Sequence, residues 1–330
     1  MPTADISFMN TNNETTRNNR PLVAIKCIAY NHDRYIRDTL DGFVMQRTNF
    51  PFVAIVHDDA STDETAAIIR EYADKYPEII KPILETENLY SKADGSLTRV
   101  MQEAIDATGS KYVAFCEGDD YWTDSLKLQK QVDFLEANPD YSMCFHNAVE
   151  HWEDGNVSDR LFAPLEKRDY DYKEMGAGWN VPTASAIVRK KIFDSNLYKK
   201  ATSCRSFIYG DILIWLTAVE FGKIHCTGET MSVYRRHAHG VTFTKSPDRL
   251  KRIITHCQAL PVIFGDKYKF SAIDSTVNLS LGMCLKSIKN RDFKTFWEYF
   301  SISFGYAPLQ TLKKYSSALA NKLRGCSKGH

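Results

Sequence analysis

Apolar segments alternate with segments of helical spacing through the first part of the chain, and this alternation limits the fold more than any other feature. Residues 22–29, 52–56, 79–84 and 112–116 have the length and composition of buried strands, and residues 34–45, 61–75, 96–107 and 124–138 have helical spacing. Two neighbouring parallel strands need a long crossover, usually a helix. Four strand-then-helix units with short connections therefore predict an α/β fold with a doubly wound, mostly parallel sheet.

The fourth apolar segment ends in three carboxylates, Glu117, Asp119 and Asp120, with Gly118 among them to relax the backbone. Acidic groups this close repel one another unless a cation lies between them, and Mg²⁺ and Mn²⁺ bind oxygen ligands. The stretch predicts a metal site at the carboxyl end of a strand, where open α/β sheets bind their ligands. A solvated acidic loop is the alternative, because Asp and Glu are mostly exposed.

Two further polar turns are expected at the same edge of the sheet. Tyr30 and Asn31 follow the first strand, and Asp58 and Asp59 follow the second. Doubly wound sheets bind nucleotides at this edge. Residues 61–64, which start with Ser and end with Glu, have the spacing of a capping box for the next helix.

The rest of the chain is less regular. We expect strands at residues 141–149 and 184–188, a long loop at 153–178, a helix at 212–221 closed by Gly222, and a short β pair at 224–226 and 231–234. Residues 1–20 are expected to be a disordered leader, 21–245 the α/β domain, and 246–330 a lysine-rich helical region. The helical region could contact a membrane surface, pack on the α/β domain or dimerise.

Composition excludes some classes of function. The formal charge of +1 gives no reason to expect nucleic acid as a partner. Eight cysteines without a CxxC pair are typical of a reduced, cytoplasmic protein. We see no signal peptide at the start and no apolar run of membrane-spanning length.

Five motifs in this order resemble those of family 2 glycosyltransferases, which have the GT-A fold and use nucleotide-diphospho-sugars. They are AIKCIAYNHDRYI (residues 24–36), HDDASTDET (57–65), CEGDDYW (116–122), YGDILIWL (209–216) and MSVYRRHAHGVT (231–242). The match spans about residues 21–245. The resemblance implies a metal-assisted, inverting transfer of a sugar, from a UDP-sugar to a cell-envelope glycan or a lipid-linked oligosaccharide, on the cytoplasmic side.

The resemblance also implies roles for single residues. Tyr30, Asn31, Asp58 and Asp59 would hold the nucleoside, although Asp59 could instead cap the next helix. Glu117, Gly118 and Asp119 match the DxD motif, in which Asp119 binds Mg²⁺ or Mn²⁺ and Glu117 acts on the cation, on the ribose or through water. Asp120 and Trp122 match positions beside the transferred sugar or the acceptor, with plain packing as the alternative for Trp122.

Three of the four remaining site residues lie in the second half of the domain. Asp211 would be the catalytic base, with a helix cap as the alternative. His237 would lie near the metal and the diphosphate, while Arg235 would clamp phosphate or lie on the surface. Lys92 is a further phosphate candidate.

Two other classes of function stay open. A sugar-1-phosphate nucleotidylyltransferase shares the sheet and the metal chemistry, but no Gly-rich loop with a following Arg comes after the first strand. A non-catalytic nucleotide- or glycan-binding protein would have the same binding site without a catalytic base. A dehydrogenase is disfavoured because no GxGxxG follows the first strand.

Overall fold

The computed structural model describes residues 20–177, 181–238, 240 and 248–326. Contacts divide the chain into two compact units. The sheet unit comprises residues 1–171, 179–195 and 217–244, and the helical unit comprises residues 172–178, 196–216 and 245–330. The predicted leader lies outside the described residues apart from Arg20, and the predicted domain boundaries stay a prediction.

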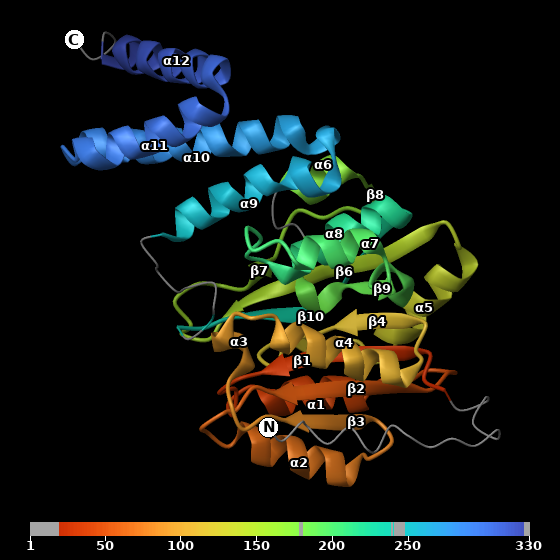
Figure 1. Ribbon diagram of the computed structural model, residues 1–330. Helices are drawn as coiled ribbons and strands as arrows, with labels where there is room; N and C mark the ends of the chain where they lie inside the picture. Colours follow the sequence, from red (N-terminus) through yellow and green to blue (C-terminus); the bar gives the residue numbers. More distant parts are fainter. Residues whose placement is uncertain (1–19, 178–180, 239, 241–247, 327–330) are drawn as a thin grey trace. The chain divides into compact units, whose positions relative to one another are not determined.

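The sheet unit is built on one mostly parallel sheet, as the sequence predicts (Figure 1). Its main strands are β1 (Val23–Ala29), β2 (Phe52–Asp58), β3 (Ile80–Leu84), β4 (Tyr112–Phe115), β5 (Tyr121–Trp122), β6 (Tyr141–Trp152), β9 (Ile187–Arg189) and β10 (Lys223–Arg236). Their order is β3-β2-β1-β4-β9-β6-β10-β5. The first four run parallel, β9 is antiparallel to β4 and β6, β10 is parallel to β6, and β5 is antiparallel to β10.

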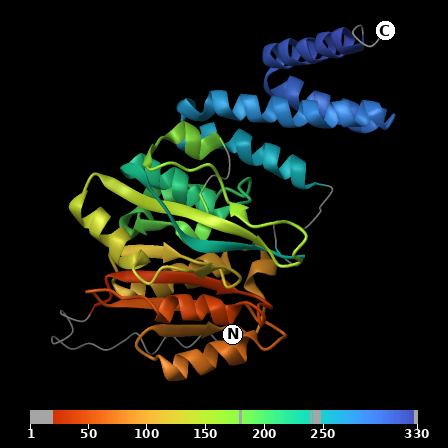
Figure 2. The ribbon, with the colours of Figure 1, turned by 180° about the vertical axis from the view of Figure 1, so that it is seen from behind.

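Helices cover both faces of the parallel strands. On one face, α1 (Ile36–Val44), α2 (Thr65–Lys75) and α5 (Lys127–Ala137) pack on alternate residues of β1, β2 and β4 in one buried cluster. On the other face, α4 (Ser96–Thr108) contacts β1 and β2. Figures 1 and 2, seen from opposite sides, show α4 in front in one view and α1 in front in the other. The predicted helical spacing is thus the spacing of the side chains that face the sheet.

Three local expectations are wrong, each for a physical reason. The predicted β pair at 224–226 and 231–234 is a single strand, β10, whose register on β6 shifts between Cys226 and Ser232. Gly228 lies in this irregular part with φ +76°, so the alternation of apolar residues is interrupted without a turn. The predicted loop at 153–178 contains β7 (Arg160–Leu161), β8 (Arg168–Tyr170) and α6 (Tyr172–Ala177). These elements are too short for a periodic pattern.

The capping box is the third wrong expectation. Helix α2 begins at Thr65, and the backbone N–H of Thr65 donates to Asp63 Oδ1 at 2.9 Å. Ser61 instead accepts a hydrogen bond from the backbone N–H of Asn31 at 2.9 Å, across the edge of the sheet. The residue expected to cap a helix therefore joins two loops.

The described helices of the helical unit include α7 (Asn196–Thr202), α9 (Arg249–Phe264), α10 (Lys269–Lys289), α11 (Phe293–Tyr306) and α12 (Pro308–Cys326). Ile254, Cys284 and Tyr299 form a small core between α9, α10 and α11. Helix α8 (Gly210–Phe221) is shared by the two units. Within the described residues, none of the helices combines the length and apolar character needed to cross a bilayer.

Candidate functional site

The turns that follow β1, β2 and β4 meet at one edge of the sheet, as the sequence predicts. The backbone N–H of Asp59 donates to the carbonyl of Ala29 at 2.9 Å, and the N–H of Gly118 donates to the carbonyl of Ile28 at 2.9 Å. These bonds hold the ends of three neighbouring strands together. Their polar side chains therefore share the edge at which parallel sheets bind ligands.

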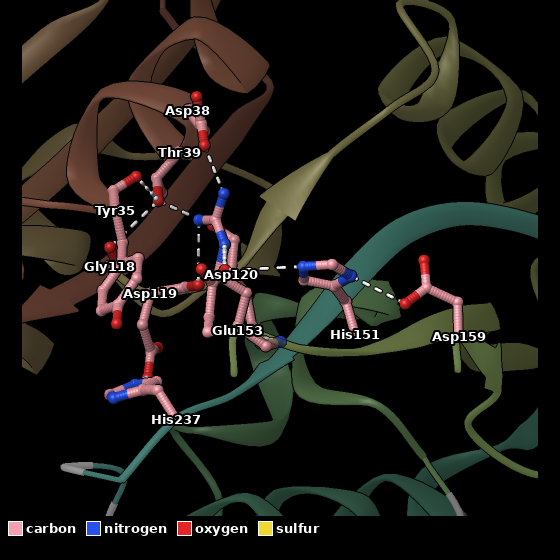
Figure 3. Close-up of polar contacts among 11 residues, drawn as sticks. Tyr35, Asp38, Thr39, Gly118, Asp119, Asp120, His151, Glu153, Asp159 and His237 are labelled. Atoms are coloured by element: carbon pink, nitrogen blue, oxygen red, sulfur yellow. Dashed lines mark hydrogen bonds and ion pairs between the residues drawn. The ribbon is translucent and has the colours of Figure 1, made fainter. Parts of the chain in front are cut away.

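Two histidine rings approach the carboxylate of Asp119. Nε2 of His237 lies 3.0 Å from Asp119 Oδ2, and Nε2 of His32 lies 3.9 Å from the same oxygen. One ligand atom from each of the three residues lies within 4.8 Å of the other two. Figure 3 shows the Asp119 carboxylate directed at the ring of His237.

This group fits a divalent cation. With metal–ligand bonds of about 2.1 Å, neighbouring ligands of an octahedral ion lie about 3 Å apart and opposite ones about 4.2 Å. The measured separations from Asp119 Oδ2 of 3.0 and 3.9 Å fall in this interval. Sequence reasoning selected Asp119 and His237 but assigned no role to His32. The available signal was its position directly after the Tyr30–Asn31 turn, at the predicted edge.

The backbone fixes His32 in this position. Its N–H donates to Thr65 Oγ1 at 2.8 Å, and its carbonyl accepts from the N–H groups of Tyr35 and Ile36 at the start of α1. A Cβ on Gly118 would come within 2.9 Å of His32 Nδ1. Gly118 is therefore required by the close approach of the imidazole and not, as the sequence suggests, to relax the backbone.

The two neighbouring carboxylates, Asp119 and Asp120, have pKa values shifted in opposite directions. Burial raises the pKa of Asp119, but the hydrogen bond from His237 and the charges of both histidines outweigh it, so the pKa lies below its usual value. Burial, followed by the negative charge of Asp119, holds the pKa of Asp120 well above its usual value. Burial also lowers the pKa of His32, although the negative charge of Asp119 opposes this shift.

Asp120 is 2% exposed and engaged inside the protein. Its Oδ1 accepts from the backbone N–H of Arg235 at 2.9 Å, and its backbone carbonyl accepts from Thr39 Oγ1 at 2.6 Å. Asp120 thereby joins the turn after β4 to β10 and α1. Its contact with a sugar or an acceptor stays a prediction.

Arg235 connects four segments around the same turn. Its guanidinium forms ion pairs with Asp38 of α1 and, at 2.8 Å, with Glu153. It also donates to the backbone carbonyl of Asp119 at 3.2 Å, and its side chain is only 6% exposed. With these protein partners, Arg235 acts on the site as a positioning residue, and the predicted phosphate clamp stays a prediction.

The predicted nucleoside residues differ in how the protein engages them. Tyr30 is 44% exposed, while Asn31, with φ +56°, accepts from the N–H of Thr62 at 2.8 Å. Asp58 is 2% exposed, and its Oδ2 accepts from the N–H of Ser61 at 3.1 Å. Its Oδ1 is buried without a hydrogen-bond partner among the described residues. A buried acceptor of this kind calls for an N–H or O–H from a ligand or water.

Asp59 and Lys92 have local partners. Asp59 accepts from the N–H groups of Leu89 and Tyr90 at 2.7 and 3.0 Å, at the start of the short helix α3 (Leu89–Lys92), whose N-cap residue is Asn88. The alternative of a cap on the next helix, α2, is wrong, because the Asp59 carboxylate is held by the first residues of α3 instead. Lys92 Nζ pairs with Glu87 at 2.7 Å on the surface. The ligand-binding roles of Asp59 and Lys92 stay predictions.

Two residues of the predicted site, Glu117 and Trp122, lie outside the group formed by Asp119 and the two histidines. Glu117 is half-buried. Trp122 is 2% exposed, its indole N–H donates to the carbonyl of Ala184 at 2.8 Å, and its ring packs edge-on against Phe43. This is the packing role that the sequence left open for Trp122.

Asp211 lies in the first turn of α8, where its Oδ1 accepts from the N–H of Ile212 at 2.8 Å. It is half-buried and belongs to the helical unit, whereas Asp119 belongs to the sheet unit. Its role as the catalytic base stays a prediction.

Comparison with known proteins gives a consistent result. A family model described as "Glycosyl transferase family 2" matches residues 26–197. An uncharacterised protein of Mycobacterium tuberculosis strain H37Rv is 38% identical over 230 residues, which are 69% of this chain and 63% of that protein. The chain thus matches less than two thirds of the length of this relative.

A second relative has a specific name. The UDP-Glc:alpha-D-GlcNAc-diphosphoundecaprenol beta-1,3-glucosyltransferase WfaP of Escherichia coli is 26% identical over 235 residues, which are 70% of this chain and 84% of WfaP. Among solved structures, S. aureus TarS 1–349 in complex with UDP-GlcNAc has a TM-score of 0.54 and 13% identity, with 86% of this chain and 91% of that chain covered. At this identity the likeness concerns the fold.

Proposed function

Because the chain belongs to glycosyl transferase family 2, we propose that it is an inverting glycosyltransferase that moves a sugar from a UDP-sugar to a hydroxyl group of a cell-envelope glycan or a lipid-linked oligosaccharide. The fold is of the GT-A type, with a mostly parallel sheet. The observation that carries the proposal is the group of Asp119, His32 and His237 beside the turns after β1 and β2. This arrangement joins a cation site to the nucleotide-binding edge of the sheet.

The nucleoside of the donor would lie against the turns after β1 and β2. The exposed ring of Tyr30 offers a surface for stacking, and Asp58 Oδ1 offers a buried acceptor for an N–H of the base. Asn31 and Asp59 hold these two turns in shape through their own hydrogen bonds. The name of WfaP, which specifies UDP-Glc, and the UDP-GlcNAc complex of TarS support a UDP-sugar as donor.

Asp119 and His237, with Glu117 nearby in sequence, would hold Mg²⁺ or Mn²⁺. When bound, such a cation supplies positive charge to the departing nucleoside diphosphate. The histidines keep the pKa of Asp119 below its usual value, so this carboxylate is ionised and available as a ligand at neutral pH. Arg235 holds the Asp119 carbonyl in place, and Asp120 fixes the turn to β10.

Asp211 would take the proton from the acceptor hydroxyl as its oxygen attacks the anomeric carbon. A single displacement of this kind inverts the configuration at that carbon. A carboxylate in the first turn of a helix has the backbone N–H groups of that turn near it, which fixes its orientation. The YGDILIWL motif supports this role, because Asp211 stands at the position of the base in related enzymes.

The helical segment supports a second proposal, contact with the inner surface of the cytoplasmic membrane. Residues 246–330 contain fourteen Lys and Arg and five Asp and Glu, a formal charge of +9, so residues 1–245 carry −8 of the total of +1. On α11, Phe293, Trp297 and Phe304 are 65, 60 and 39% exposed along one face. Positive charge beside exposed aromatic rings suits a bilayer with anionic lipids. The seven cysteines whose side chains are described form no disulfide, in keeping with the cytoplasmic side.

A donor panel tests the main proposal. The full-length protein would be incubated with UDP-, GDP- and dTDP-sugars, Mn²⁺ and a lipid-linked glycan extract, and nucleotide release and labelled product would be followed. We expect UDP release only with a UDP-sugar, no donor binding in Asp119→Ala, and retained donor binding with lost turnover in Asp211→Asn. Asp133→Asn, an exposed carboxylate on α5, is the matched control and should behave as wild type.

The same assay separates the other classes. A nucleotidylyltransferase would release diphosphate from UTP and a sugar phosphate, and a non-catalytic binding protein would bind the donor without any release. If Asp211→Asn transfers sugar at the wild-type rate, Asp211 is not the base.

A further inference from the structure

The fold adds a histidine to the cation site that the motifs describe. We propose that His32 is a ligand of the cation held by Asp119 and His237, and that this set of two imidazoles and one carboxylate binds Mn²⁺ in preference to Mg²⁺. The proposal rests on the cation site of the proposed function and adds to it a residue and a choice of metal.

The orientation of the His32 ring leaves one nitrogen for a cation. Nδ1 is the atom that a Cβ on Gly118 would meet at 2.9 Å, so this nitrogen faces the backbone after β4. Nε2 is 3.9 Å from Asp119 Oδ2, beyond the range of a hydrogen bond. A separation too long for a direct bond and near that of two ligands on one ion is the geometry of a shared cation.

Both imidazoles are held without a metal. The ring of Tyr35 lies 4.7 Å from that of His237 and 6.4 Å from that of His32, and the two imidazoles stand at 89° to one another. The side chains of His32 and His237 are 16 and 4% exposed. Rings packed in this way keep Nε2 directed at Asp119, so a cation would bind without a large loss of side-chain freedom.

The preference for one metal follows from the ligand atoms, which are two imidazole nitrogens and one carboxylate oxygen. Mg²⁺ takes oxygen ligands almost exclusively and gives up its water reluctantly, whereas imidazole nitrogen suits first-row transition metals. Mn²⁺ accepts nitrogen and oxygen together in octahedral geometry. Three protein ligands leave about three positions for diphosphate oxygens or water.

Metal binding can be measured without the sugar-transfer reaction. Full-length protein freed of metal by a chelator would be titrated with Mn²⁺ or with Mg²⁺ as competitor, with and without UDP, and free Mn²⁺ would be read from its electron paramagnetic resonance signal. We expect Mn²⁺ to bind at least about tenfold more tightly than Mg²⁺, and His32→Gln to weaken Mn²⁺ binding about tenfold or more. His151→Gln, an exposed histidine paired with Asp159, is the matched control and should bind Mn²⁺ as wild type does.

Counting the imidazole nitrogens bound to Mn²⁺ by spectroscopy distinguishes a metal ligand from a side chain that only supports the site. Electron spin-echo modulation by ¹⁴N should show two imidazoles on Mn²⁺ in the wild-type protein and one in His32→Gln. The wild-type count does not depend on how the variant folds. One imidazole in the wild type, an unchanged count in His32→Gln, or no Mn²⁺ binding with or without UDP would each overturn the proposal.

The outcomes distinguish this proposal from the proposed function. Sugar transfer by a protein that binds no Mn²⁺, with or without UDP, would overturn the role of His32 and leave the transferase. Mn²⁺ held by two imidazoles, in a protein that releases nucleotide from no donor, would overturn the transferase and leave the metal site.

Discussion

In the turn after β4, the adjacent residues Gly118, Asp119 and Asp120 differ in their contacts and therefore in their roles. Asp119 is kept ionised by two histidines, whereas burial next to Asp119 favours the protonated form of Asp120. Gly118 between β4 and these carboxylates has no space for a side chain, because a Cβ would lie 2.7 Å from that of Ala29. Three adjacent positions thus have separate tasks: spacing at Gly118, the proposed ligation at Asp119 and attachment to β10 at Asp120.

Replacement of Gly118 by alanine tests the spacing. The added methyl group would meet Ala29 and His32, and such overpacking costs about 1–3 kcal/mol. We expect a lower midpoint of thermal unfolding and weaker Mn²⁺ binding in Gly118→Ala. Gly282→Ala in α10 is the control, because a Cβ there meets nothing within 4 Å and alanine favours a helix. An unchanged midpoint in Gly118→Ala would show that the turn can move aside.

Lys127 makes the stability of the sheet unit depend on pH. Its side chain is fully buried, with Nζ 4.1 Å from the centre of the Trp122 ring and 2.7 Å from Gln131 Oε1. Burial lowers the pKa of Lys127 from its usual value to about 7. Between that pH and the pKa of about 10.4 in the unfolded chain, the unfolded state binds a proton that the folded state lacks. Stability therefore rises with pH in this window, by up to about 1.4 kcal/mol per unit.

Urea unfolding at pH 7 and pH 9 measures this effect. In Lys127→Met we expect the gain in unfolding free energy between the two values to be smaller than in wild type, by on the order of 2 kcal/mol. Lys289→Met, an exposed lysine of α10, should keep the wild-type difference. Equal pH dependence in all three proteins would mean that Lys127 is charged when folded.

At the scale of elements, Arg235 of β10 joins α1, the segment after β6 and the turn after β4. Its guanidinium also lies 4.4 Å from the Tyr121 ring of β5. Sequence alone selected the arginine but not these partners, because Asp38 and Glu153 are distant from it in the chain. The three elements around the cation site are therefore linked by one side chain.

Replacement of this arginine should loosen the site. In Arg235→Gln we expect a loss of stability of about 1–3 kcal/mol, since buried donors and their partners lose hydrogen bonds, together with weaker Mn²⁺ binding. Calorimetric unfolding and the Mn²⁺ titration measure the two effects. Arg37→Gln removes an exposed pair with Glu71 and should change neither. Wild-type Mn²⁺ affinity in Arg235→Gln would contradict the positioning role.

At the scale of the whole molecule, charge is divided unevenly along a nearly neutral chain. The basic segment 246–330 also carries the exposed aromatic face of α11. A bilayer surface would satisfy both properties, because anionic headgroups attract the lysines and the interface accepts Trp and Phe. Attraction of this kind weakens as salt screens it.

Vesicle flotation with the full-length protein tests this contact. We expect binding to vesicles of phosphatidylglycerol and phosphatidylcholine, little binding to phosphatidylcholine alone, and less binding at 1 M salt. The double variant Phe293→Ser, Trp297→Ser should bind about tenfold less. Leu161→Ser, an exposed apolar residue of β7, is the control. If no protein floats and the double variant instead converts a dimer into a monomer in light scattering, the face binds a second copy of the chain.

The strand-and-helix order and the polar edge of the sheet were predictable because they depend on local patterns. Apolar spacing predicted β1, β2, β4, α1 and α5, and the turn residues predicted which strand ends would carry Asp58 and Asp119. Short or irregular strands were not predictable. Strands β7 and β8 have too few residues to show an alternation of apolar side chains, and the irregularity near Gly228 interrupts that alternation in β10.

The sequence by itself determined the class of fold, the family motifs and Asp119 as the proposed metal ligand. Only the tertiary structure decided that His32 joins His237 at Asp119, that Gly118 is needed for close approach, and that Arg235 is held by protein carboxylates. Patterns in sequence record how each segment relates to its neighbours in the chain. A ligand set depends instead on which side chains the packed sheet brings within a few ångströms, and that distance is fixed only when the whole unit folds.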